Sequence, residues 1–317
     1  MGREFLMSTS VRRMTIGTFV AAMVFGQVVP AYAAKPAQGS GGSGPLMGID
    51  VSYPQCGVTL PTGQTFGIVG VNGGLANDLN SCLGPSASYP NYTQSELYWA
   101  VTTSLGTSSQ PTASLYVNTA DPGNVYGHTL ITDWPTSGST PNDGTCDTTT
   151  VTLRGQIDTV GANSPACAWL YGFNKATQDS TWLTDAANAI NAQMGAATVP
   201  NAAGGYPWWL DVETANTWQS GTSGQAMNVA DLQGMIAALS GNGATRIGAY
   251  STSSQWSQIT GGTSTNSGTL VGIPNWIPGA TSSTGAATNC AQTSFTAGTV
   301  LVTQWTTSTF DNDYACP

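Results

Sequence analysis

The sequence predicts an α/β fold, a TIM-like (β/α) barrel that is irregular because few helices cover its last third. Short apolar segments bounded by Gly, Pro, Asn or Asp recur along the chain, which is typical of buried strands. Amphipathic helical patterns separate several of these segments, and strands that alternate with helices indicate a parallel sheet. The stretch from Leu46 to Pro317 is close in length to the roughly 250 residues of one (β/α)₈ barrel.

Eight apolar segments are predicted to be the barrel strands, because each is short and bounded by turn-forming residues. They are Met47–Val51, Phe66–Val71, Ala113–Val117, Ala168–Phe173, Trp208–Val212, Arg246–Tyr250, Pro274–Ile277 and Val300–Trp305.

Helices are predicted where apolar residues recur every three or four positions. This pattern is clear in Trp182–Met194 and Val229–Leu239 and weaker in Leu97–Leu105. The segments Gly261–Gly272 and Ala280–Gly298 are rich in Gly, Ser and Thr and show little helical periodicity. The sequence therefore predicts a barrel with a sparse helical coat in its last third.

The N-terminus has the layout of a secretory signal peptide. Arg12 and Arg13 precede the apolar run Met14–Val29, and the small residues of Ala31–Ala34 follow it. We expect residues 1–34 to be the signal peptide, 35–45 a Gly/Ser/Pro linker and 46–317 the barrel domain. The alternative is an uncleaved N-terminal anchor, and the export route stays open. The expected location is extracellular, with association to the cell wall as one possibility.

The 6 cysteines all follow the predicted signal peptide, and an even number in an exported chain indicates disulfide bonds. Pairing of near neighbours is expected, namely Cys56 with Cys82, Cys146 with Cys167 and Cys290 with Cys316. No metal or other cofactor is expected, because one His and no C-x-x-C pair give no zinc-ligand pattern.

Charged residues make up only 7% of the chain, and the formal net charge is −9. The cations beyond residue 34 are Lys35, Arg154, Lys175 and Arg246, so no basic patch can neutralise phosphates. Nucleic acid is therefore excluded as a partner. We expect a monomer that does not insert into a membrane once its leader is cleaved.

The apolar segment WWLDVE, residues 208–213, ends with two carboxylates. Because side chains alternate along a strand, Asp211 and Glu213 point to the same face. In barrel enzymes the C-terminal ends of the strands carry the chemistry. Two neighbouring acids in apolar surroundings acquire different pKa values, so that one donates a proton while the other stays ionised, as glycoside cleavage requires. The structural alternative is that both acids cap a helix or bind loop backbone.

A second acidic group is predicted at the same rim. Asp50 should face the barrel interior, since Ile49 and Val51 would face the helices. Asp311 and Asp313 follow the last predicted strand, and the first and last strands of a barrel are neighbours. Asp50 should therefore meet Asp311 or Asp313, although the latter two alone also fit a turn.

The stretch from Thr119 to Pro165 is a long insertion rich in Asp, Pro, Gly and Thr. Loops of this length in compact domains are usually functional or folded. It is expected either to wall one side of a cleft, held by a disulfide, or to be a surface decoration.

These motifs, in this order, resemble glycoside hydrolase family 25, the Chalaropsis-type lysozymes. The resemblance spans residues 48–313 through GIDVS, FGIVGVN, YGFN, LDVE, IGAYST, PNWIPGA and QWT…FDND. It implies a secreted enzyme, a divergent bacterial relative, that hydrolyses peptidoglycan between N-acetylmuramic acid and N-acetylglucosamine.

The resemblance also implies roles for individual residues. Glu213 would be the general acid, and Asp211 would stabilise the positively charged intermediate, with the N-acetyl group of the substrate as nucleophile. Asp50 would orient water or substrate, while Asp311 or Asp313 would complete the acidic rim. Tyr250 matches an aromatic residue of the family.

Other residues are expected to bind the sugar. Trp209, Trp276 and Trp305 lie at predicted strand ends, where pyranose faces stack on aromatic rings. Asn72, which stands where the family usually has Glu, is also expected at the substrate. This replacement favours a second hypothesis, a catalytically silent carbohydrate-binding barrel. A serine hydrolase using His128 is a third, but the chain has no G-x-S-x-G motif.

Beyond the signal peptide the chain has only the glutamates Glu96 and Glu213. Glu96 lies on a predicted amphipathic helix, so its replacement is expected to cost little activity.

Overall fold

The computed structural model describes residues 46–73, 76, 78–107, 110–262, 268–307 and 310–317. The predicted signal peptide and the linker, residues 1–45, lie outside these ranges.

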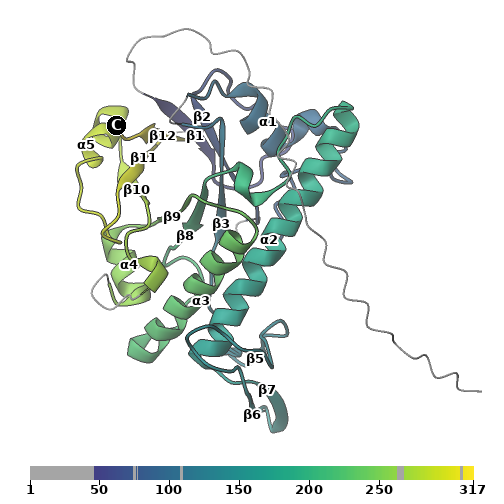
Figure 1. Ribbon diagram of the computed structural model, residues 1–317, viewed down its shortest axis with the longest axis vertical. Coiled ribbons are helices and arrows are strands. Elements are labelled where there is room, and N and C mark those ends of the chain that lie inside the picture. The colour runs from purple at the N-terminus through teal and green to yellow at the C-terminus, as the bar shows by residue number, and fades with distance from the viewer. Residues whose placement is uncertain (1–45, 74–75, 77, 108–109, 263–267, 308–309) are drawn as a thin grey trace, which may run out of the picture. The chain divides into compact units, whose positions relative to one another are not determined.

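A closed barrel of eight strands forms the centre of the domain (Figure 1). Around the barrel the order is β1 (Met47–Val51), β12 (Asp311–Ala315), β11 (Val300–Thr306), β10 (Asn275–Ala280), β9 (Ile247–Tyr250), β8 (Trp208–Asp211), β3 (Ala113–Asn118) and β2 (Phe66–Gly70). Neighbouring strands are parallel except that β12 runs antiparallel to both β1 and β11. The predicted α/β barrel is confirmed.

Five helices of the described ranges connect the parallel strands. They are α1 (Glu96–Thr103), α2 (Pro165–Met194), α3 (Gly221–Gly241), α4 (Ser253–Thr260) and α5 (Ser283–Asn289). Short 3₁₀ turns lie at Tyr92–Gln94, Ala203–Gly205 and Gly268–Leu270. The last two helices have 8 and 7 residues, against 30 and 21 in α2 and α3. The helical coat is therefore sparse in the last third, as predicted.

The prediction of a strand at Ala168–Phe173 is wrong, because this segment lies inside α2. Ser164 caps the helix by accepting a hydrogen bond from the Cys167 backbone N–H, and Pro165 occupies the first turn, where it leaves no helical hydrogen bond unmade. A short apolar run in a buried helix has the same pattern as a buried strand. The YGFN motif is therefore helical.

The eighth strand is instead β12, Asp311–Ala315, in a region predicted as an acidic turn. Asp and Asn have low strand propensity, so local sequence did not indicate it. Barrel closure requires this strand, because its pairing with β1 and β11 removes two exposed sheet edges.

Side chains fill the barrel on both sides of the sheet. Val51, Leu115 and Leu210 pack outward against the helices, and a second apolar cluster that includes Phe66 and Ile68 fills the interior. Ile49 and Val51 pack on the outer side, which confirms that Asp50 faces inward.

Helices α2 and α3 lie side by side (Figure 1), and small residues allow their close approach. A Cβ atom on Gly234 would lie 1.9 Å from the carbonyl oxygen of Trp169, and one on Gly172 would lie 2.1 Å from that of Asp231. Glycine is therefore required at both positions.

The 119–165 insertion folds into two hairpins, β4 (Val125–Tyr126) with β5 (Thr129–Leu130) and β6 (Thr148–Leu153) with β7 (Gln156–Gly161). All three predicted disulfides are present, and Cys146–Cys167 joins the insertion to α2. No helix among the described residues is long and apolar enough to cross a membrane.

Candidate active site

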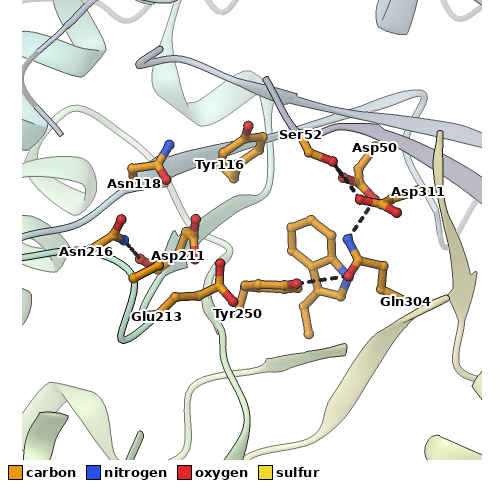
Figure 2. A pocket seen from close by; sticks show the side chains of 12 residues that line it. Asp50, Ser52, Tyr116, Asn118, Asp211, Glu213, Asn216, Tyr250, Gln304 and Asp311 are labelled. Carbon is orange, nitrogen blue, oxygen red and sulfur yellow. Dashed lines mark hydrogen bonds between the residues drawn. The ribbon is translucent and has the colours of Figure 1, made fainter. Parts of the chain in front are cut away.

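A pocket of about 310 Å³ opens at the C-terminal ends of the barrel strands (Figure 2). Four carboxylates line it: Asp50 from β1, Asp211 from β8, Glu213 just beyond β8, and Asp311 from β12. Residues distant in sequence meet here because the C-terminal ends of the parallel strands, and the N-terminal end of the antiparallel β12, lie at one end of the barrel. None of the described residues that line the pocket is a cation.

Asp50 is the best-connected carboxylate of the pocket. Gln304 Nε2 donates to its Oδ2 at 2.9 Å, and the Oγ of Ser52 lies 3.0 Å from its Oδ1 and 2.7 Å from Asp311 Oδ2. Gln304 in turn accepts a hydrogen bond from the Tyr250 hydroxyl at 2.9 Å. Burial raises the pKa of Asp50 from 3.8 to about 7, since it outweighs the opposing hydrogen bond from Gln304, and the charge of Asp311 adds to the rise.

Asp211 and Glu213 reach the same pocket, as strand alternation predicts. Asp211 is only 8% exposed, and its Oδ1 has no hydrogen-bond donor among the described residues. Burial raises its pKa well above the usual value, and the charges of Glu213 and Asp50 raise it further. Burial therefore keeps Asp211 protonated over a wider pH range than an ordinary aspartate.

The turn after β8 fixes the backbone of Glu213. Its carbonyl oxygen accepts hydrogen bonds from the Asn216 backbone N–H at 3.1 Å and from the Trp218 indole N–H at 2.9 Å. The carboxylate is more exposed than that of Asp211, and Gln255 Nε2 lies 3.4 Å from its Oε1. Glu213 is thus held at the mouth of the pocket, within reach of a ligand.

Aromatic residues form one wall of the pocket. The rings of Tyr250 and Trp276 are 4.4 Å apart at 61°, and the Tyr116 hydroxyl donates to the Val51 carbonyl at 3.1 Å. Acids opposite aromatic rings are typical of sugar-binding sites, because the rings supply apolar faces.

Comparison with known proteins finds one similar curated protein. The chain is 34% identical over 127 residues to "Probable GH family 25 lysozyme 4" of Dictyostelium discoideum, which covers 38% of this chain and 56% of the relative. Over these residues the chain is similar to a protein named as a family 25 lysozyme. It spans little more than half the length of this curated relative. No family model and no solved structure matches it.

Two acids predicted at the rim differ in position. Asp50 pairs with Asp311 across β1 and β12, so the predicted meeting of these two residues is confirmed. Asp313 is fully buried and does not line the pocket. Burial and the charge of Asp50 raise the pKa of Asp313. It lies beneath Asp50 rather than at the rim.

Of the predicted sugar-binding tryptophans, Trp276 alone lines this pocket. Trp209 packs against Trp276 inside the barrel, with ring centroids 6.0 Å apart, and lines a different pocket at the N-terminal ends of the strands. Trp305 neighbours the inward-facing Gln304 on β11, so it points to the opposite face of the sheet.

Asn72 does not line the pocket either, since its side chain is 1% exposed and bound to Asn118. Its Oδ1 accepts the Asn118 backbone N–H at 2.8 Å, and its Nδ2 donates to the Asn118 carbonyl at 2.9 Å. Asn118 itself lines the pocket, so Asn72 positions the end of β3.

Sequence reasoning missed several polar residues that line the pocket. These are Ser52, Tyr116, Asn118, Asn216 and Gln304. Alternation along the strands indicates two of them: Gln304 shares a face with Val302, and Asn118 with Tyr116. Ser52 and Asn216 lie in turns, where no periodic signal exists.

Glu96, whose replacement we expected to cost little activity, lies on α1 as predicted. Its side chain is fully buried, with Oε1 accepting the Gln55 backbone N–H and Oε2 accepting Asn80 Nδ2, both at 2.7 Å. Burial raises its pKa from 4.5 to about 7, against the effect of both hydrogen bonds. Glu96 therefore has a structural role and is a poor neutral control.

Within the described ranges, no cluster of three or more His, Cys, Asp and Glu side chains is arranged to hold a metal ion.

Proposed function

We propose that this protein is a secreted glycoside hydrolase that cleaves cell-wall glycan of the peptidoglycan type, as an N-acetylmuramidase does. The observation that carries the proposal is the convergence of Asp50, Asp211, Glu213 and Asp311 on one open pocket beside Tyr250 and Trp276. The similarity to a protein named as a lysozyme and the three disulfides support it.

In this mechanism Glu213 protonates the glycosidic oxygen as the bond to the leaving sugar breaks. Glu213 delivers this proton because its side chain is half-buried and lines the pocket, whereas Asp211 is buried.

Asp211 then stabilises the positive charge that develops on the sugar ring, with the substrate's N-acetyl group as internal nucleophile. Asp50 stands across the pocket, where Gln304 and Ser52 fix its orientation, and it directs water to the intermediate. With a nucleophile supplied by the substrate, the separation of the carboxylates does not decide the stereochemistry.

A catalytically silent sugar-binding barrel is the second candidate. It is favoured by one observation: Asn72 stands where the family usually has an acid, and both ends of its side chain are committed to Asn118.

Clearing of purified bacterial cell walls by the protein without residues 1–34 distinguishes the two candidates. Glu213→Gln should lower the clearing rate by at least about 100-fold, the usual contribution of a general acid. The matched control is Asp185→Asn, which removes one negative charge from an exposed position of α2. Clearing that survives Glu213→Gln would refute the role of Glu213, and binding without clearing by the unmodified protein would favour the silent barrel.

A further inference from the structure

A second cavity opens at the opposite end of the barrel from the carboxylates. It has a volume of about 210 Å³ and is lined at or just before the first residues of β3, β8, β9, β10 and β11. Among the described residues it shares none with the pocket that holds the carboxylates. The rings of Trp209, which lines this cavity, and Trp276, which lines the other, pack against each other. We call the cavity the basal pocket, and the proposed glycan chemistry makes no use of it.

The walls of the basal pocket are apolar and rigid. Pro111, Pro207 and Pro274 stand before β3, β8 and β10 and line it, and each proline fixes its own φ angle. The carbonyl oxygens of Pro207 and Pro274 accept hydrogen bonds from the backbone N–H groups of Leu115 and Ala249, both at 2.9 Å. The barrel therefore holds these walls in place without a ligand, so that binding orders little of the protein.

An aromatic ring lies deep in the basal pocket. Trp209 is 4% exposed, and a Cβ atom on Gly248 would lie 2.4 Å from Cζ3 of its ring, so the ring lies directly against β9. Val302 is also buried here, whereas Leu301 at the mouth is exposed. The pocket thus offers an apolar ligand a fixed ring at its inner end and aliphatic groups along its side.

One cation lies at the mouth of this apolar pocket. Arg246 is exposed, and among the described residues it is the only charged group of the lining. Its backbone is fixed, because its carbonyl oxygen accepts the Trp208 backbone N–H at 2.8 Å. In the described ranges the one ion pair joins Lys175 to Asp133, so the Arg246 guanidinium has no carboxylate partner there.

Charge and size select the kind of ligand. A guanidinium binds a carboxylate through charge-assisted hydrogen bonds. The pocket at the other end of the barrel has four carboxylates and no cation among its described lining residues, so it would repel the same anion. A volume of about 210 Å³ is below the roughly 300–1,000 Å³ of pockets for drug-sized ligands. The basal pocket therefore suits a single ring or a short chain that carries one carboxylate.

We propose that the basal pocket binds a small amphipathic carboxylate, with its apolar body against Trp209 and the prolines and its carboxylate at the Arg246 guanidinium. The site is separate from the glycan site. Its test needs no enzymatic activity, so its failure and that of the proposed function are distinguishable.

The test measures by calorimetry the affinity of the protein without residues 1–34 for phenylacetate and for phenylacetamide, its uncharged counterpart of nearly the same shape. The unmodified protein should bind phenylacetate about 10-fold more tightly than phenylacetamide, because only the carboxylate pairs with the guanidinium. Arg246→Met should remove this preference and leave the affinity for phenylacetamide unchanged. The control is Arg154→Met, which removes the same charge from an exposed residue that does not line the pocket.

A second pair of variants tests where the ligand lies. Thr245→Tyr adds a ring at the exposed mouth of the basal pocket and should weaken the binding of both compounds by at least about 10-fold. Thr284→Tyr adds the same ring at an exposed position of α5 and should change neither affinity.

Three results would overturn the inference. The first is no measurable binding of phenylacetate at millimolar concentration, and the second is equal affinity for phenylacetate and phenylacetamide. The third is an equal loss of phenylacetate binding in Arg246→Met and Arg154→Met, or unchanged binding in Thr245→Tyr, since either would place the anion elsewhere on the protein.

Discussion

Replacing Glu96 by Gln removes one buried ionisable group that lies outside the pocket. The size and shape of the side chain stay nearly the same. Glu96 is 0% exposed, and burial raises its pKa from 4.5 to about 7. In the unfolded chain the group ionises near 4.5, so between these two values folding becomes less favourable as pH rises. The stabilising contribution of protonated Glu96 is thus full below about pH 4.5 and lost as pH rises through about 7.

The size of the effect follows from the difference between the two pKa values. A rise from 4.5 to about 7 is worth about 3 kcal/mol, since each tenfold change in proton affinity corresponds to about 1.4 kcal/mol. The amide introduced by Glu96→Gln cannot ionise. The unfolding free energy of the unmodified protein should therefore fall relative to that of the variant by about 3 kcal/mol between about pH 4 and pH 8.

Urea unfolding with the disulfides intact, repeated across this pH range, measures the difference. Loss of the acceptor for Gln55 or Asn80 shifts the variant's stability by a constant amount, so only the pH dependence is diagnostic. Asp185→Asn is the control and should give a difference independent of pH, because Asp185 is exposed. If the difference in unfolding free energy between Glu96→Gln and the unmodified protein did not depend on pH, the conclusion that burial raises the pKa of Glu96 would be refuted.

Three further substitutions test the pocket and the packing of α2 on α3. Gln304→Leu removes the hydrogen bond that lowers the pKa of Asp50, so the acid limb of the pH–rate profile should move to higher pH; an unmoved limb would argue against ionised Asp50 in the reaction. Asp211→Asn should lower clearing by about 100-fold while melting at neutral pH holds or rises, because the amide cannot ionise in its buried position; full activity would contradict the role of the carboxylate. Gly234→Ala should cost about 1–3 kcal/mol by calorimetry, since its Cβ would meet the Trp169 carbonyl, and a neutral effect would show that α2 and α3 move apart freely.

Local sequence predicted seven of the barrel strands well. β1 was predicted with the bounds that it has, Met47–Val51, because apolar residues and flanking Gly and Ser define it. The error at Ala168–Phe173 arose because a short run of apolar residues fits a strand and a helix equally, and only packing of α2 on α3 decides between them.

For the site, alternation placed Asp50, Asp211 and Glu213 in one pocket, and the order of strands brought Asp311 beside Asp50. The roles of Asp313 and Asn72 could not be predicted, because burial depends on neighbours distant in sequence. The same holds for Glu96, whose partners come from two loops.

The sequence by itself determined the α/β class, the presence of six cysteines for disulfide bonds and the small set of acids available for chemistry. These depend on periodicity, composition and spacing, which are local properties of the chain. Only the tertiary structure decided that β12 closes the barrel and that burial raises the pKa values of Asp50, Asp211 and Glu96. Barrel closure, desolvation and pocket shape arise from contacts between distant segments, so no local pattern encodes them.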